Sequence, residues 1–185
     1  MVRRLEGLRA GVFAAEGVED LEYYVTVMRL QEEGVTVDTV ALSMASFRGK
    51  NGLEVIPDVT VEQAAAVAYD VLVLPGGWAP DKLRRSEGVL GIIRARYAAG
   101  AVIGAICHGP WLLVSADLVR GRRATGSLGI KDDLVNAGAE WVDESAFTDG
   151  QLVWGRVVAD IPNFCHALVE RLLEYSVSRA DPGPS

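Results

Sequence analysis

The sequence predicts an α/β protein with a doubly wound, mostly parallel sheet and helices on both faces. Short apolar or β-branched runs alternate with helical stretches along the chain. Residues 71–74 are continuously apolar, which is typical of a central strand covered on both faces. Of the 185 residues, 50% are hydrophobic, enough for one substantial core. We therefore expect one domain over residues 1–178, followed by a disordered tail at residues 179–185.

The chain begins with a β-α-β unit. Residues 8–14 predict a short strand and residues 19–33 a helix, which Gly34 ends, as a glycine just past a helix commonly does. Residues 35–42 are rich in β-branched side chains and predict the second strand. A helix between two such strands predicts parallel pairing with a right-handed crossover. Three apolar residues, spaced three or four apart, are expected to form the core face of the helix: Leu21, Val25 and Met28.

Turn residues lie on both sides of the central strand. Residues 49–52 have turn chemistry, and residues 53–56 are expected to form one arm of a small hairpin. Residues 61–67 predict a short helix. After the apolar run, Pro75 is followed by Gly76 and Gly77, whose backbone N–H groups no side chain obstructs. These two glycines suit an oxyanion hole, and an ordinary strand-to-helix turn explains them equally well.

The next strand ends on a cysteine. Ser86 is expected to cap a helix that reaches Ala99, and the apolar residues 101–106 then predict a buried strand. Cys107 follows directly, and the next residues, Gly109-Pro110, suit a tight turn that opens a helix. Small residues two positions before and after a nucleophile are typical of a nucleophile elbow. The helix N-terminus favours the thiolate, whereas a buried structural cysteine is the alternative.

The last third of the chain predicts a helix, two strands and a final helix. Residues 131–138 form the first of these helices, and residues 141–142 and 152–157 are interpreted as strands around the turn Asp149-Gly150. Pro162 lies in the first turn of the final helix. Five residues form the apolar stripe of this helix: Phe164, Cys165, Leu168, Val169 and Leu172.

Composition and charge exclude several classes of function. A formal net charge of −7 argues against nucleic acid as a partner, because phosphate binding needs clustered Lys and Arg. No run of about eighteen apolar residues is present, so we expect no membrane span. Charged residues and Gly7 interrupt the N-terminal segment, which excludes an export signal and favours the cytoplasm. Two cysteines outside any CxxC pattern predict no disulfide framework and no metal site.

Several polar side chains are expected near the cysteine, because sites in doubly wound sheets form at the carboxyl ends of strands. A protonated Glu22 would donate a hydrogen bond to the thiolate of Cys107, and Glu19, one helical turn away, would form a second wall. Complementing the helix dipole is the alternative role of both acids. His108 is expected to act as general base or to supply a backbone N–H to an oxyanion.

Six segments carry a family resemblance: Gly17-Val18-Glu19-Asp20-Leu21-Glu22, Arg29-Leu30-Gln31-Glu32-Glu33-Gly34, Val73-Leu74-Pro75-Gly76-Gly77, Ala105-Ile106-Cys107-His108-Gly109-Pro110, Gly129-Ile130-Lys131-Asp132-Asp133 and Asn136-Ala137-Gly138-Ala139-Glu140-Trp141-Val142-Asp143. In this order they resemble the ThiJ/PfpI superfamily, most closely its PfpI-type intracellular protease branch. The resemblance implies a flavodoxin-like fold, no cofactor, a nucleophile at Cys107, a triad histidine at His108 and a glutamate beside the thiol at Glu22. It also implies oxyanion donors from Gly76 and Gly77.

The resemblance further implies self-association. In PfpI-type proteins the third triad acid comes from a neighbouring subunit, and the matching residue here is Asp81, one methylene shorter than the family's glutamate. A homo-oligomer, either a dimer or a hexamer, is therefore expected. Ser127 stands where some members have a tyrosine, and Trp78 where an arginine is frequent, so both residues are expected to reshape the substrate pocket.

Together these observations predict a stress-related cysteine-dependent hydrolase. Its substrates would be small carbonyl compounds, glycated adducts or short peptides, and the sequence leaves peptidase, glyoxalase and deglycase activity open. The alternative is a non-enzymatic oxidative-stress sensor or chaperone-like protein in which Cys107 is oxidised to sulfenate or sulfinate.

Overall fold

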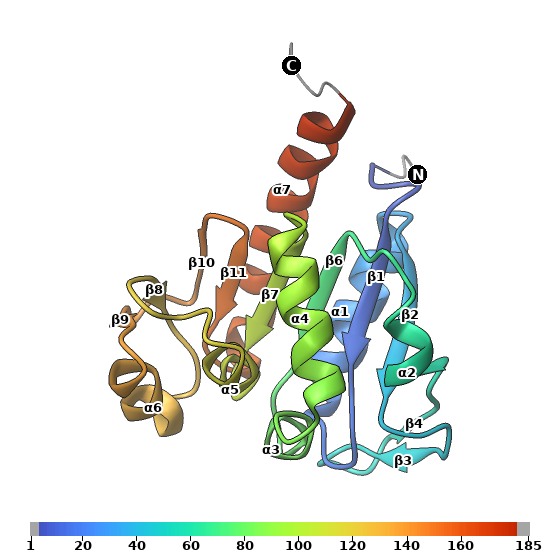
Figure 1. Cartoon of the computed structure of the whole chain (residues 1–185), viewed down its shortest axis with the longest axis horizontal. Helices are drawn as coiled ribbons and strands as arrows, with labels where there is room; N and C mark the ends of the chain where they lie inside the picture. The colour runs from blue at the N-terminus through green and yellow to red at the C-terminus, as the bar shows by residue number, and fades with distance from the viewer. Residues whose placement is uncertain (1–3, 181–185) are drawn as a thin grey trace.

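A seven-stranded sheet forms the centre of the computed structural model, which describes residues 4–180 (Figure 1). The strands are β1 (Arg9–Phe13), β2 (Thr36–Ala41), β5 (Val59–Thr60), β6 (Val71–Leu74), β7 (Val102–Ile106), β10 (Ala146–Asp149) and β11 (Leu152–Gly155). Their order is β10-β11-β7-β6-β1-β2-β5, and all neighbours are parallel except β10 and β11. The predicted doubly wound, flavodoxin-like fold is confirmed.

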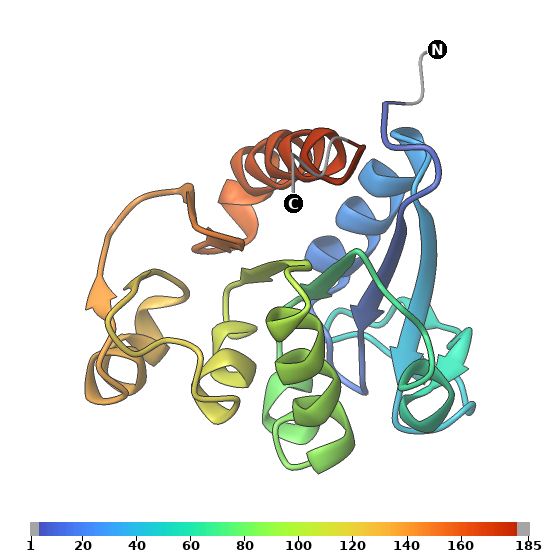
Figure 2. The same ribbon diagram turned by 45° about the horizontal axis from the view of Figure 1, so that its top comes forward.

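Helices cover both faces of this sheet (Figure 2). The helix α1 (Asp20–Glu32) packs beside α7 (Ile161–Ala180) on one face. The other face carries α2 (Val61–Ala64), α3 (Ala79–Leu83), α4 (Glu87–Ala98) and α5 (Pro110–Ser115). Within residues 4–180, no helix combines the length and apolarity needed to cross a bilayer.

Small elements surround the main sheet. The hairpin of β3 (Phe47–Arg48) and β4 (Glu54–Val55) confirms the predicted arm at residues 53–56. A second pair consists of β8 (Arg123–Ala124) and β9 (Glu140–Trp141), joined through the short η1 (Leu128–Ile130) and α6 (Lys131–Asn136). The short η2 (Val158–Asp160) precedes α7.

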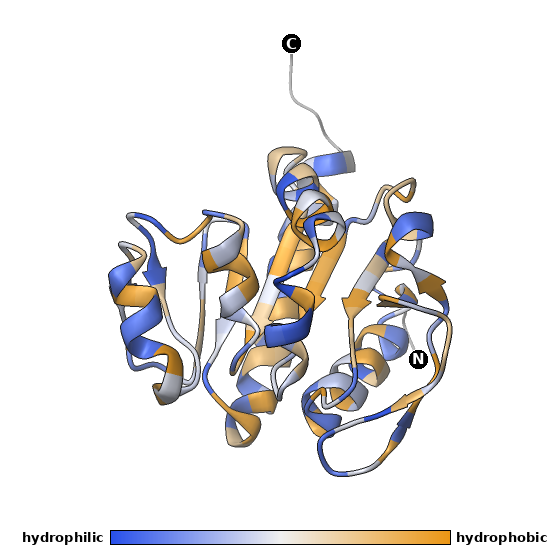
Figure 3. Cartoon of the chain, turned by 60° about the horizontal axis from the view of Figure 1, so that its bottom comes forward, coloured by the Kyte–Doolittle hydropathy of each residue, from blue (hydrophilic) through white to orange (hydrophobic). Residues whose placement is uncertain are grey.

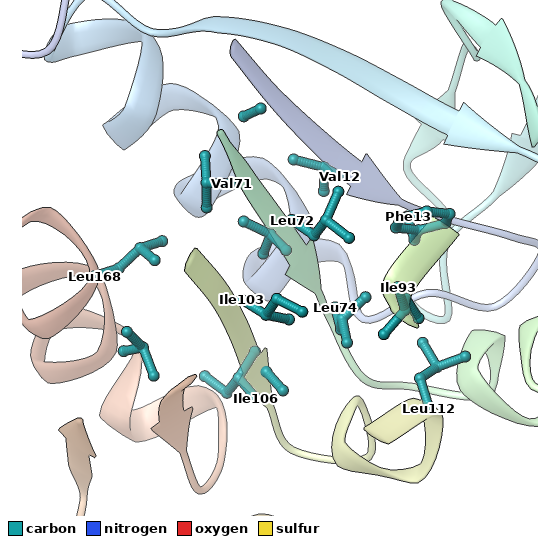
Figure 4. Packing of buried hydrophobic residues seen from close by; sticks show 14 of the residues in the cluster. Val12, Phe13, Val71, Leu72, Leu74, Ile93, Ile103, Ile106, Leu112 and Leu168 are labelled. Carbon is teal, nitrogen blue, oxygen red and sulfur yellow. The ribbon is translucent and has the colours of Figure 1, made fainter. Parts of the chain in front are cut away.

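The core lies between the sheet and both helical layers. The central strands are mostly hydrophobic, whereas the helices alternate between hydrophobic and hydrophilic residues (Figure 3). Leu72 and Ile103 are fully buried in neighbouring strands. Ile93 of α4, Leu112 of α5 and Leu168 of α7 belong to the same cluster (Figure 4). Burial on both faces explains why these strands are continuously apolar.

The predicted core face of α1 is wrong. The three apolar residues expected there are largely exposed: Leu21 (48%), Val25 (39%) and Met28 (61%). Instead Glu22, Thr26 and Leu30, spaced four apart, are fully buried. The two polar members of this face lie close to partners, since Glu22 accepts from Gly76 and the Thr26 hydroxyl lies 3.9 Å from the Cys165 sulfur. A partnered polar group can be buried at little cost, and a hydrophobicity pattern does not detect that.

Pairing near the C-terminus also differs from the prediction. The turn Asp149-Gly150 joins β11 to β10, and not to residues 141–142, which were predicted as its partner strand. Trp141 instead pairs with Ala124 of β8. Both segments are short, and the pairing depends on strand β8, which the sequence pattern did not reveal. At the chain end, α7 continues through Ala180, and residues 181–185 of the expected tail lie outside the described residues.

The strand order determines where a site forms. From β1 the chain moves outward to β2 and then returns to β6 on the other side of β1. Ligand sites in such sheets lie where the order reverses, beyond the carboxyl ends of the strands. Here the two loops at that position are joined by a bridge between Val18 and Gly77. The segments after β1, β6 and β7 therefore meet at one edge.

Candidate active site

The corner after β7 has the geometry of a nucleophile elbow. Cys107 adopts a φ of 63°, a left-handed conformation that is uncommon for a residue with a side chain. Two residues later, a Cβ on Gly109 would lie 1.9 Å from the Leu74 carbonyl oxygen, so only glycine fits. Pro110 then begins α5. The Cys107 side chain is partly exposed, in contrast to the buried Cys165.

Glu22 lies fully buried beside this thiol. Its Oε2 accepts a hydrogen bond from the Gly76 amide at 2.7 Å. Within residues 4–180, its Oε1 has no hydrogen-bond partner. Burial raises the pKa of Glu22 to about 7, although hydrogen bonds from Gly76 and Cys107 oppose that rise. Near neutral pH, this carboxyl group therefore exchanges between its protonated and ionised forms.

The thiol is harder to ionise than the sequence predicts. Burial, followed by the charge and hydrogen bond of Glu22, raises the pKa of Cys107 to about 12. The backbone N–H groups of Gly77 and His108 act in the opposite direction but are outweighed. The expected lowering of the thiol pKa by the N-terminus of α5 is thus wrong. Protonation of Glu22 removes only the smaller causes of this rise, so formation of the thiolate still depends on a base that takes the thiol proton.

His108 is placed to be that base. Its Nδ1 lies 3.2 Å from the Cys107 sulfur, within hydrogen-bond reach. Burial, together with the nearby charge of Lys50, lowers the pKa of His108. The imidazole is therefore neutral at pH 7 and can accept a proton. Its ring meets Trp111 edge to face, with centroids 5.2 Å apart.

The oxyanion donors differ in one member from the prediction. The Gly76 amide donates to Glu22 and is not available to a substrate oxygen, so its predicted oxyanion role is wrong. Gly77 and His108 present backbone N–H groups to the Cys107 sulfur. Gly77 has a φ of 75°, and a Cβ there would lie 2.4 Å from the Gly17 carbonyl oxygen. Glycine is thus required at position 77 both for its conformation and for space.

These groups open into a pocket of about 790 Å³. The remaining predicted site residues all line it: Glu19, Trp78, Asp81 and Ser127. Trp78 is 62% exposed at the mouth, and Ser127 donates its amide to the Cys107 carbonyl at 2.8 Å. Asp81 forms an exposed ion pair with Arg85 at 3.3 Å, and within residues 4–180 no carboxylate hydrogen-bonds to His108.

One wall of the pocket comes from the loop after β3, which sequence reasoning missed. The buried carboxylate of Asp20 accepts from the amides of Asn51 at 2.7 Å and Leu53 at 2.8 Å. This contact fastens the loop to the start of α1 and brings the Lys50 ammonium group to 3.7 Å from Glu19. Residues 49–52 predicted only a turn, because the partner carboxylate lies thirty positions earlier in the chain.

The hydrophobic wall was also missed in part. Trp111 and the segment 157–159 also line the pocket. Trp111 is held by a hydrogen bond from its Nε1 to Asp133 at 2.9 Å and by the guanidinium of Arg84 over its ring. The position of Trp111 directly after Pro110 could have indicated that it lines the site, since the first turn after an elbow faces the same edge as the nucleophile.

This chain is similar to known proteins over most of its length. A model of the DJ-1/PfpI family matches residues 8–171. The protein named Deglycase PH1704 from Pyrococcus horikoshii is 40% identical over 158 residues, which cover 85% of this chain and 95% of that protein. Deglycase PfpI from Pyrococcus furiosus is 36% identical over 159 residues, or 86% and 96% of the two chains.

Solved structures show the same similarity. A two-domain protein from Anabaena variabilis, with DJ-1/ThiJ/PfpI-like and ferritin-like domains, superposes with a TM-score of 0.86 at 34% identity. The match covers 89% of this chain and 48% of that one. Drosophila melanogaster DJ-1beta superposes with a TM-score of 0.82 at 26% identity, covering 94% and 97% of the two chains. The segments that form the pocket all fall within the matched region.

Proposed function

This chain belongs to the DJ-1/PfpI family, and we propose that it is a cysteine-dependent hydrolase of the deglycase type that acts on small carbonyl compounds and glycated adducts. The names of its archaeal relatives support deglycase chemistry. The observation that carries the proposal is the position of Cys107. Its sulfur faces a 790 Å³ pocket, with a neutral imidazole 3.2 Å away and two backbone N–H donors beside it.

The first chemical step is addition of sulfur to a carbonyl carbon. His108 Nδ1 takes the thiol proton while the sulfur–carbon bond forms and the carbonyl electron pair moves to oxygen. The N–H groups of Gly77 and His108 then bind the oxyanion, which is where preorganised donors act most strongly. The high pKa of the Cys107 thiol makes this base necessary, because little thiolate exists beforehand.

The second step depends on the substrate. For an aldehyde next to a ketone, a proton leaves the carbon bound to sulfur and a proton is added at the neighbouring carbon. This converts the adduct to a thioester without an external oxidant. Water then attacks the thioester, the carbon–sulfur bond breaks, and the thiol regains its proton as the hydroxy acid leaves. Glu22, whose pKa of about 7 lets it hold or release a proton at neutral pH, serves as the second proton carrier.

A second copy of the chain is part of the proposed site. His108 needs an acid to orient its ring. Asp81 lies at the pocket rim, where it is exposed and forms an ion pair with Arg85 instead of contacting the His108 of its own chain. We infer that Asp81 serves a neighbouring subunit. The exposed apolar stripe of Leu21, Val25 and Met28 supports self-association, since apolar surface of this kind favours burial. Sedimentation velocity tests this inference, and a monomer at micromolar concentration would contradict it.

The experiment that tests the proposed activity is conversion of methylglyoxal to lactate without glutathione, alongside release of methylglyoxal adducts from N-acetylarginine. We expect turnover by the natural chain and by Cys165→Ser, which alters only the buried cysteine of α7. Cys107→Ser should lose at least about a hundredfold in kcat, as expected when a nucleophile is removed. Equal rates in both variants would refute a role for Cys107.

A redox-sensing role is the second candidate, and one observation favours it. Glu22 Oε1 lacks a hydrogen-bond partner within residues 4–180 and lies beside the thiol, so a protonated carboxyl could donate to an oxygen added to sulfur. Mild peroxide followed by mass spectrometry tests this role. Oxidation confined to Cys107 would support it, whereas methionine oxidation with Cys107 still reduced would exclude it.

A further inference from the structure

A second groove lies at the edge of the sheet opposite to Cys107. It has a volume of about 600 Å³ and is positioned where β6 and β7 begin (Figure 1). We call it the arginine groove, because its lining includes Arg96, Arg171 and Arg179. Arg171 and Arg179 are eight residues apart on α7 and therefore share one helix face. Arg96 comes from the last turn of α4.

One of the three arginines is neutralised within the groove. Asp70 is buried at the start of β6 and pairs with Arg179. The same carboxylate also accepts from the Arg9 amide at 2.9 Å and from the Tyr175 hydroxyl at 3.3 Å. Its capacity to accept hydrogen bonds is thus largely used by these fixed partners, and it neutralises a single guanidinium.

The other two arginines keep positive charge and free donors. Arg96 donates its Nε to the Tyr69 carbonyl at 2.9 Å, and within residues 4–180 its guanidinium pairs with no carboxylate. Arg171 donates its Nε to the Gly150 carbonyl and meets Glu174 only at 3.5 Å on the exposed side. Each guanidinium has five N–H donors, so both retain unused ones. An exposed ion pair of this kind contributes little.

Small residues leave the groove open between these side chains. Ala68, Ala99 and Gly100 form part of its lining. No heavy atom lies within 4 Å of the position that a Cβ on Gly100 would take. The Nε–carbonyl bonds of Arg96 and Arg171 fix both guanidiniums at the sides of this space. A ligand can therefore approach them without displacing protein atoms.

We propose that the arginine groove binds a small phosphate monoester. A phosphate group has three acceptor oxygens, which suits several guanidinium forks at once, whereas a carboxylate has only two. The space exceeds that of a phosphate alone, so it accommodates an attached organic group of a few atoms. In a chain with a net charge of −7, this local positive charge is what draws an anion to the groove.

Isothermal titration calorimetry with glycerol 2-phosphate, at constant ionic strength, tests the proposal. We expect saturable 1:1 binding that glycerol alone does not give. Arg96→Gln and Arg171→Gln should each weaken the affinity at least tenfold, and two variants guard against one that fails to fold. Arg94→Gln is the matched control, because this residue lies on the same helix but outside the groove and should bind as the natural chain does.

Cys107→Ser separates the groove from the thiol pocket and should also bind unchanged. Absence of saturable binding by the natural chain would overturn the proposal. The proposal would also be overturned if both groove variants bound as tightly as the natural chain. Loss of binding in Cys107→Ser would overturn it too, because that result would assign the phosphate to the pocket beside the thiol.

Discussion

Replacing Glu22 by glutamine should change how the stability of the fold depends on pH. The unfolded chain ionises this carboxyl group near its ordinary pKa of 4.5, whereas burial raises the folded value to about 7. The contribution of Glu22 to the free energy of unfolding is therefore fully present below pH 4.5. It is lost as pH rises through 7, because the folded state must then hold a buried charge. The difference in pKa corresponds to about 3 kcal/mol.

Glu22→Gln keeps the shape and an acceptor for the Gly76 amide but cannot ionise. Urea unfolding between pH 4.5 and 8 should show the natural chain losing about 3 kcal/mol relative to the variant across that range. Glu33→Gln is a control, because the stability contributed by Glu33 should depend on pH in the opposite direction. A hydrogen bond from Arg4 lowers the pKa of Glu33, so its stabilisation is lost as pH falls. Parallel curves for the natural chain and Glu22→Gln would refute the assignment of a raised pKa to Glu22.

Three further predictions concern the site. Glu22→Gln should lower the pKa of the Cys107 thiol by about 1–3 units, the usual effect of a neighbouring charge, and the pH dependence of alkylation measures it. Gly76→Ala should abolish activity and cost about 1–3 kcal/mol, because the new Cβ would lie 2.7 Å from the Cys107 Cβ; Gly91→Ala, with open space around it, should instead raise the melting temperature. Asp20→Ala should raise KM more than it lowers kcat, because it frees a wall of the pocket and leaves the thiol in place, and an unchanged KM would contradict this account.

Local patterns were sufficient to predict the doubly wound sheet and the cysteine elbow. Both are encoded in consecutive residues: an apolar run, then Cys107, then Gly109-Pro110. The helix cap at Ser86 is equally local, and its side chain does accept from the Val89 amide. Features of this kind depend on neighbours a few positions away, so the sequence displays them directly.

Features that depend on distant partners could not be predicted in this way. The buried face of α1 contains Glu22 and Thr26 because each has a partner, one in the turn after β6 and one in α7. The spacing of apolar residues along the sequence does not reveal those partners. The pKa of Cys107 likewise depends on how deeply Glu22 is buried beside it, whereas its position after a strand suggested only the helix dipole. Gly76 was assigned the wrong acceptor for the same reason.

The anchoring of the loop after β3 by Asp20 has an evolutionary consequence. Two amide hydrogen bonds to one carboxylate hold the loop, and neither depends on the side chains at positions 50 and 51. Those side chains can therefore diverge between lineages while the loop stays attached and the corner at Cys107 keeps its shape. A substitution at position 50 can thus change both the lining of the pocket and the pKa of His108, to which the charge of Lys50 contributes, without detaching the loop.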